Sequence, residues 1–140
     1  LIPNVWHACT NSLFLSDKNS ALTNLATPGQ DTTVIAITIL SMDGFIMATS
    51  KIAKTKRADG IIALGTVIKG ATSHFDYISG ECAKGLSRVQ LDEGIPVGFG
   101  VLMVDTLEQA LERAGTKSGN KGEEATLAVI EMINLLRKID

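Results

Sequence analysis

The chain has 140 residues, of which 45% are hydrophobic and 20% are charged, and this composition is typical of one globular domain. Its net charge of -2 creates no field that would attract nucleic acid or a membrane surface, and its aromatic content of 4% leaves no stacking platform for single-stranded nucleic acid. Because no apolar run approaches the roughly 18 residues that cross a bilayer, we expect no membrane-spanning segment. Taken together, these features lead us to expect a single cytoplasmic domain over residues 1–140, with neither membrane nor nucleic acid as a partner.

The first third of the chain carries the weakest local signals. The opening stretch LIPNVW fits the end of a strand, although Pro3 would confine such a strand to a sheet edge or place it at the strand's start. Residues Asn11–Ala26 fit a helix that Pro28 and Gly29 would end. Its apolar face would carry Phe14, Ala21, Leu22 and Leu25. The sequence begins with Leu1 and not with Met, as a processed or incomplete chain would, and it shows no signal peptide.

Three short apolar runs further along the chain are typical of strands buried on both faces. They are rich in β-branched and aliphatic residues and do not alternate with polar ones, which favours a parallel sheet covered by helices on both sides. The predicted strands are Val34–Leu40, Gly60–Ile68 and Ile95–Val104.

Segments with helical patterns lie between and after these strands. The clearest has a capping-box pattern at Thr106 and Gln109 and a stop at Gly115, whereas Gly80 and Gly85 weaken the pattern of another. The predicted helices are Gly44–Lys56, Asp76–Glu93, Thr106–Ala114 and Glu123–Ile139. This order predicts an α/β fold, a three-layer α/β/α sandwich with a central, mostly parallel four-stranded sheet.

The two cysteines, Cys9 and Cys82, form no CxxC pair and fit no zinc-ligand spacing. We interpret them as two free thiols in a reducing compartment. No other cluster of metal-ligating residue types occurs in the sequence, so we expect no metal site.

The first candidate for chemistry is the stretch Gly70-Ala71-Thr72-Ser73, followed by His74. In open parallel sheets, ligands bind at the carboxyl ends of the strands, and this stretch follows a predicted strand and precedes a predicted helix. Its backbone N–H groups could point at an anion, and an imidazole can transfer protons near neutral pH. A bare turn and a structural histidine are the competing interpretations.

The second candidate is the stretch ERAGTKSGNKG, residues 112–122. It combines Arg113 with two lysines and three glycines. An arginine fork and a lysine point charge near exposed N–H groups suit a phosphate monoester. Alternatively, Arg113 only caps the end of a helix, where a cation is favoured by the helix dipole.

Three long motifs now carry a family resemblance. The stretches IIALGTVIKGATSHFDYISGECAKGL, PVGFGVLMVDTLEQALERAGTKSGNKGEEA and AVIEMINLLRKI resemble the 6,7-dimethyl-8-ribityllumazine synthase family of riboflavin biosynthesis, over residues 52–140. The resemblance implies a transferase that condenses 5-amino-6-(D-ribitylamino)uracil with 3,4-dihydroxy-2-butanone 4-phosphate and releases phosphate and water. It implies no metal and no organic cofactor.

The resemblance also implies roles for individual residues. His74 would transfer protons, and the phosphate would be held by Ala71, Thr72 and Arg113, with Lys121 nearby. The pyrimidine and ribityl site would be lined by Thr66, Val67, Ile68 and Phe99. That site would lie between neighbouring subunits of a pentamer, either alone or within an icosahedral shell of pentamers.

The amino-terminal third departs from the family's pattern. The family's arginine-aromatic-asparagine triplet is replaced by Val5-Trp6-His7, in which Trp6 keeps a flat face for stacking on the pyrimidine. The family's proline-glycine-aromatic-glutamate loop is replaced by ILSMDGFIM, where Asp43 is the nearest acid. Three functions therefore stay open: the enzyme, a lumazine-synthase-like assembly protein that has lost catalysis, and a generic phosphate-binding α/β module.

Overall fold

The computed structural model describes residues 20–26, 32–39 and 42–139, and of residues 20–26, 39, 42 and 43 it describes the backbone alone. Several sequence-based predictions therefore lie outside the described residues: the strand at LIPNVW, the aromatic contact of Trp6 and the free thiol of Cys9.

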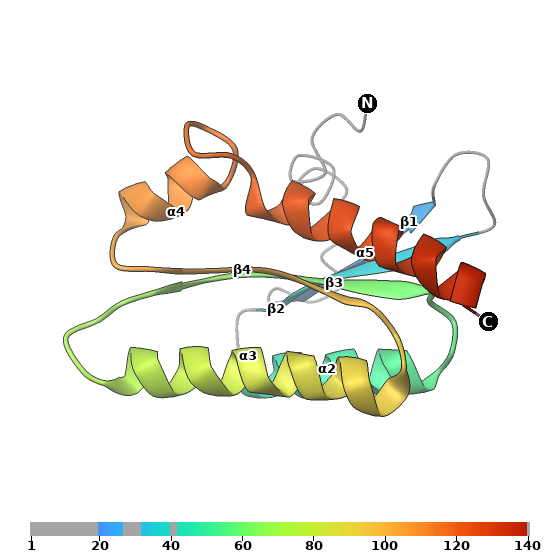
Figure 1. Cartoon of the computed structure of the whole chain (residues 1–140). Helices are drawn as coiled ribbons and strands as arrows, with labels where there is room; N and C mark the ends of the chain where they lie inside the picture. Colours follow the sequence, from blue (N-terminus) through green and yellow to red (C-terminus); the bar gives the residue numbers. More distant parts are fainter. Residues whose placement is uncertain (1–19, 27–31, 40–41, 140) are drawn as a thin grey trace.

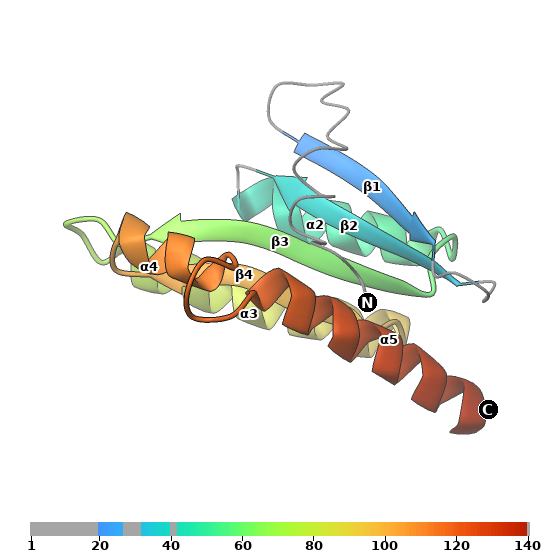
Figure 2. The same cartoon turned by 90° about the horizontal axis from the view of Figure 1, so that it is seen from above.

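A four-stranded sheet in the order β1-β2-β3-β4 forms the centre of the molecule (Figures 1 and 2). β2 pairs with β3, and β3 with β4, in parallel, whereas β1 pairs with β2 in the antiparallel direction. The predicted, mostly parallel four-stranded sheet is confirmed. The strands are β1 (Ser20–Ala26), β2 (Thr33–Ile39), β3 (Gly60–Ile68) and β4 (Val97–Val104).

Helices cover both faces of this sheet, which confirms the predicted three layers. In Figure 1, α2 and α3 lie below the sheet and α4 and α5 lie above it. The helices are α2 (Met42–Lys54), α3 (His74–Glu93), α4 (Leu107–Arg113) and α5 (Lys121–Ile139). The predicted ends of these helices and of β2, β3 and β4 lie within two residues of the observed ends. One shift matters for function: α3 begins at His74 itself and not at Asp76.

The core consists of two apolar layers, one on each face of the sheet. On β3, Ile61 and Ala63 face α2 and α3, while Ile62 and Leu64 face α5, and all four are buried. This burial on both faces is the reason that β3 reads as a continuous apolar run in the sequence. The largest buried side chain between the sheet and α2 is that of Phe45.

The start of α4 confirms the predicted capping box. Thr106 precedes the helix, and its hydroxyl oxygen accepts a hydrogen bond from the backbone N–H of Gln109 (3.2 Å). The side chain of Gln109 reaches back and accepts from the N–H of Asp105 (2.9 Å). One donor of the first turn, the N–H of Gln109, is thereby paired, and the side chain of Gln109 pairs the N–H of Asp105, the residue before the N-cap.

The helix predicted over Asn11–Ala26 is wrong in its second half. Residues 20–26 form β1, in which Leu22 lies opposite Ile37 and Leu25 opposite Val34; residues 11–19 lie outside the described part of the chain. Without β1, the outer edge of the apolar strand β2 would leave its backbone N–H and C=O groups without a strand partner. Pairing with β1 satisfies these groups, and this non-local gain overrides the weak helical pattern of the segment.

Glycines allow the helices to approach closely at two places. A Cβ atom on Gly98 of β4 would lie 2.7 Å from the carbonyl oxygen of Ala125, so α5 rests directly on the backbone of β4. A Cβ atom on Gly85 of α3 would collide with the side chain of Ile46 in α2. In contrast, a Cβ atom on Gly80 would meet no atom within 4 Å.

The two glycines of α3 therefore give opposite stability predictions. Gly80→Ala should raise the free energy of unfolding by about 1 kcal/mol, because alanine favours the helix and has room. Gly85→Ala should be about 1–3 kcal/mol less stable than Gly80→Ala, because its methyl group overpacks the contact with Ile46. Denaturant unfolding of both variants measures the difference, and equal stabilities would contradict the close α2–α3 contact.

Candidate active site

The three parallel strands end at one edge of the sheet, and β3 extends beyond its neighbour there. The last paired residues of β2 and β3 are Thr38 and Leu64, whereas β3 and β4 stay paired through Ile68. Residues 66–68 of β3 thus have β4 on one side and no described strand on the other. Thr66 and Ile68 are exposed, and Val67 packs against the core on the α3 face. The predicted pyrimidine-lining segment is therefore a strand end whose β2 side has no partner among the described residues.

The turn after β3 leads directly into α3. It is tied to the sheet by the N–H of Lys69, which donates to the carbonyl oxygen of Val104 (2.9 Å), and residues 70–73 are exposed. Ser73 occupies the N-cap position of α3, but its side chain accepts no hydrogen bond from the helix. No hydrogen bond joins the backbone N–H groups of residues 71–75 to another described residue. The start of α3 therefore presents free donors, as an anion site requires.

His74 is the first residue of α3 and is exposed, so its imidazole stands beside these free donors. Exposure excludes the competing interpretation of a histidine satisfied inside the core. No hydrogen bond or ion pair holds its side chain to another described residue.

Sequence reasoning missed Lys69, the residue before the turn. Its ammonium lies 5.9 Å from the ring centroid of Phe75 and 3.9 Å from a carboxylate oxygen of Asp105. It therefore adds a positive charge to the side of the turn where β3 and β4 end. A cation directly before a small-residue turn is the signal that could have identified it.

Arg113 and Lys121 form a second group, at the two ends of a closed loop. Ala114 and Asn120 make a β-bridge, which brings the flanking Arg113 and Lys121 together. The loop is closed further by the Thr116 hydroxyl, which donates to the carbonyl oxygen of Leu111 (2.7 Å). Hydrogen bonds within the loop fix its conformation, so Arg113 and Lys121 flank a loop of defined shape.

Each of these two cations already has a partner in the chain. A guanidinium nitrogen of the half-buried Arg113 lies 3.5 Å from the carbonyl oxygen of Gln109, in the last turn of α4. This contact supports the capping interpretation, but it uses one donor of five. The ammonium of Lys121 lies 2.6 Å from a carboxylate oxygen of Glu124.

The start of α5, unlike that of α3, is closed by its own side chain. The Asn120 side-chain oxygen accepts hydrogen bonds from the N–H groups of Gly122 (3.1 Å) and Glu123 (3.2 Å). The N–H of Glu124 donates to the backbone oxygen of Asn120 (3.0 Å). Two acidic residues, Glu123 and Glu124, also occupy the first turn of α5. Of these two helix starts, only that of α3 is open to an external anion.

The two groups lie on opposite faces of the sheet. The connection from β3 leads to α3 on one face, whereas α4 and the start of α5 cover the other (Figure 1). Among the described residues, no hydrogen bond or ion pair joins the turn at 70–74 to Arg113 or Lys121. One chain thus brings together Thr66, Val67, Ile68, Ala71, Thr72 and His74, and holds Arg113 and Lys121 elsewhere.

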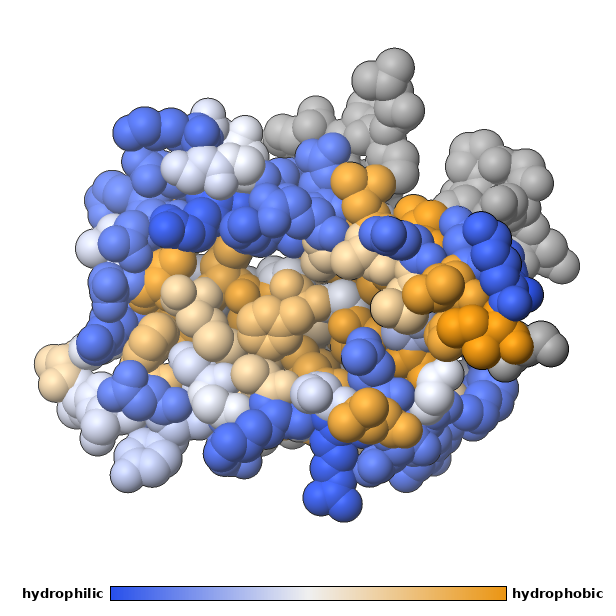
Figure 3. Space-filling view, viewed as in Figure 1, coloured by the Kyte–Doolittle hydropathy of each residue, from blue (hydrophilic) through white to orange (hydrophobic). Residues whose placement is uncertain are grey.

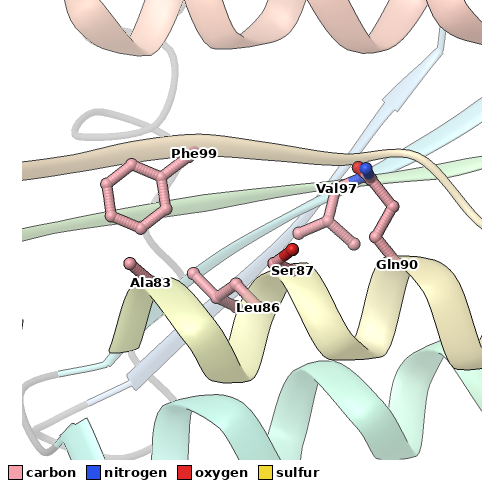
Figure 4. A pocket seen from close by; sticks show the side chains of 6 residues that line it. All are labelled: Ala83, Leu86, Ser87, Gln90, Val97 and Phe99. Carbon is pink, nitrogen blue, oxygen red and sulfur yellow. The ribbon is translucent and has the colours of Figure 1, made fainter. Parts of the chain in front are cut away.

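Phe99 belongs to neither group but lies beside the open edge of β4. Its side chain is 41% exposed and borders a pocket of about 270 Å³ between β4 and α3 (Figure 4). The pocket is lined by Ala83, Leu86, Ser87, Gln90, Val97 and Phe99. Figure 3 shows that this side of the molecule carries an apolar band between the polar outer surfaces of the two helical layers. Sequence analysis predicted Phe99 as a substrate-lining residue, but it predicted none of the α3 residues that line this pocket.

The departures from the family's pattern fall largely on undescribed residues. Trp6 and His7 lie outside the described part of the chain, and so do residues 40 and 41 of the stretch ILSMDGFIM. The remainder of that stretch, from Met42 onward, forms the first turns of α2.

Other chemical features are few in the part of the chain that the structure describes. Cys82 is a free, buried cysteine, and its burial raises the pKa of the thiol above the usual value. Within the described ranges, no group of three or more His, Cys, Asp or Glu residues could hold a metal ion, and no helix is long and apolar enough to span a membrane.

The chain matches the model of a known family. The family model described as 6,7-dimethyl-8-ribityllumazine synthase matches residues 7–137 of this chain.

The contrast between the two helix starts can be tested by alanine substitution. Asn120→Ala removes a cap that accepts two hydrogen bonds, so it should lower the free energy of unfolding by about 0.5–2 kcal/mol. Ser73→Ala, at an N-cap that makes no side-chain hydrogen bond, is the matched control and should change stability by less than about 0.5 kcal/mol. A large loss from Ser73→Ala would mean that the start of α3 is closed by its own cap.

Proposed function

The chain belongs to the 6,7-dimethyl-8-ribityllumazine synthase family, and from this premise we propose that it condenses 5-amino-6-(D-ribitylamino)uracil with 3,4-dihydroxy-2-butanone 4-phosphate. The products are 6,7-dimethyl-8-ribityllumazine, phosphate and water. The observation that carries the proposal is the open start of α3, where free backbone donors lie beside His74. We assign the reaction to the cytoplasm, where the free thiol of Cys82 would stay reduced.

The phosphate of the ketone substrate binds at the turn formed by Ala71 and Thr72. Backbone N–H groups at a helix start and the helix dipole both favour a dianion there. The nearby ammonium of Lys69, which lies 3.9 Å from a carboxylate oxygen of Asp105, is a further cation on this side of the turn. Arg113 contributes a planar fork that can grip two phosphate oxygens, and Lys121 contributes a mobile point charge.

Arg113 and Lys121 reach this phosphate from a neighbouring subunit. In one chain, α4, which ends with Arg113, and α5, which begins with Lys121, cover the opposite face of the sheet from α3, so we propose that a single chain holds two half-sites. A head-to-tail interface joins the half-site of one subunit to the complementary half-site of the next, and such an interface closes into a ring. We therefore propose a pentamer, alone or within an icosahedral shell, as the active form.

His74 serves the proton transfers of the reaction. The amine of the pyrimidine attacks the ketone carbonyl, and the resulting carbinolamine must lose water, which needs proton donation to oxygen. Loss of phosphate requires that a proton be removed from carbon. An imidazole next to the phosphate turn can donate in the first step and accept in the second.

The pyrimidine binds along the open edge of β3. The backbone N–H and C=O groups of Thr66 and Ile68, which point away from β4, can pair with the polar edge of a heterocyclic ring, as a neighbouring strand would. Trp6, which lies outside the described residues, is the aromatic side chain that we propose to stack on the pyrimidine, and Phe99 offers a second one from the next subunit. The exposed position of Phe99 beside the edge strand β4 suits a residue shared across an interface.

The activity test uses both substrates and follows lumazine fluorescence. His74→Asn should lower turnover by about 10²–10⁴-fold, nearer the low end, because both chemical steps proceed slowly without help. Glu81→Gln, which changes an exposed residue two turns further along α3, is the control and should keep wild-type turnover. Unchanged turnover in His74→Asn would remove this residue from the mechanism. Phosphate binding without lumazine formation by the wild type would instead favour the assembly protein that has lost catalysis.

Subunit mixing tests the shared site. His74→Asn and Arg113→Gln should each be nearly inactive, since each removes one half-site from every interface. When equal amounts are unfolded and refolded together, random mixing in head-to-tail rings leaves both half-sites intact at about a quarter of the interfaces. The mixture should therefore regain about a quarter of the wild-type activity. A mixture no more active than the average of its two components would place the whole site within one chain.

A further inference from the structure

The ion pair between Lys121 and Glu124 joins the second half-site to a carboxylate that no step of the proposed reaction uses. The ammonium lies 2.6 Å from one carboxylate oxygen of Glu124, and both side chains are about half exposed. The other carboxylate oxygen lies beside Gly119, within 3.1 Å of the position that a Cβ atom would take. The carboxylate is therefore held over the loop that presents the two cations.

The start of α5 does not need this ion pair. Asn120 already caps the helix with its side chain and with its backbone oxygen. An exposed pair between residues three apart on a helix stabilises it only weakly. Glu124 also differs from its neighbour Glu123, which forms no ion pair with another described residue. The position of the Glu124 carboxylate therefore calls for an explanation other than stability.

We propose that Glu124 is a positioning residue that sets the phosphate affinity of the site by competing for Lys121. Without phosphate, the carboxylate holds the ammonium over the loop. A phosphate dianion carries more charge and more acceptor oxygens, so it draws the ammonium away from this weak, exposed partner. This inference rests on the proposed function, because it requires that Lys121 face a bound phosphate.

This competition should lower the affinity of the site for phosphate. While the carboxylate stays near the ammonium, it repels the incoming phosphate and occupies one of the three donors of Lys121. It therefore lowers the affinity for the phosphorylated ketone and equally for the inorganic phosphate that is released. The pyrimidine, which carries no phosphate, is unaffected. Glu124 would thus assist product release by retaking Lys121 when phosphate leaves.

Titration of the assembled protein with inorganic phosphate tests the inference. Glu124→Gln should bind phosphate about two- to five-fold more tightly than the wild type, which is the range expected for an exposed ion pair. Glu123→Gln removes the same charge from the same helix turn and is the matched control, with a smaller change expected. In a Lys121→Met background, Glu124→Gln should have no effect, because the cation for which the carboxylate competes is gone. The KM for the ketone should fall in Glu124→Gln while the KM for the pyrimidine stays constant, a split that a loss of helix stability would not produce.

Equal or weaker phosphate binding by Glu124→Gln would overturn the inference, and so would equal tightening by Glu123→Gln, which would reveal a general charge effect. Persistence of the effect in the Lys121→Met background would overturn it as well. These results leave the proposed function intact. Absence of phosphate binding by the wild type would overturn the phosphate half of the proposed function and this inference together, so the two failures can be told apart.

Discussion

Strand β3 is the element on which the rest of the molecule depends. It is paired with β2 and β4, and its side chains are buried against α2 and α3 on one face and against α5 on the other. A strand in this position can expose functional groups only where it extends beyond one of its two neighbours. It does so at its carboxyl end, beyond the last pair with β2. The open strand edge and the anion turn are consequences of that single overhang.

The layered arrangement also separates the functional groups. A chain that crosses from β3 to α3 and from β4 to α4 places the two segments on opposite faces of the sheet. Among the described residues, no hydrogen bond or ion pair joins the turn at 70–74 to Arg113 or Lys121 of the same chain. Assembly is therefore part of the chemistry that we propose, and the apolar band beside β4 in Figure 3 is the kind of surface that a neighbouring subunit would cover.

The electrostatic design of the two helix starts reinforces this division. At α5, Asn120 and two glutamates satisfy the donors and the dipole from within the chain. At α3, the N-cap serine makes no such bond, and the donors stay available. The helix without an internal cap is the one next to His74, so anion affinity and proton transfer coincide at one place. The capped helix, α5, instead follows the loop that Arg113 and Lys121 flank.

The sequence by itself determined β2, β3, β4 and the helices between them, because residues buried on both faces of a sheet must form continuous apolar runs. It also determined the N-cap at Thr106, a local pattern that needs no distant partner, and residue type and context singled out His74 and Arg113 as candidates for the proposed site. Only the tertiary structure decided that residues 20–26 form β1, since strand pairing is non-local and overrode a helical pattern. It likewise decided that α3, which begins with His74, and α4, which ends with Arg113, cover opposite faces of the sheet, and that Lys121 pairs with Glu124. These relations depend on how the chain crosses the sheet, and linear spacing does not encode that path.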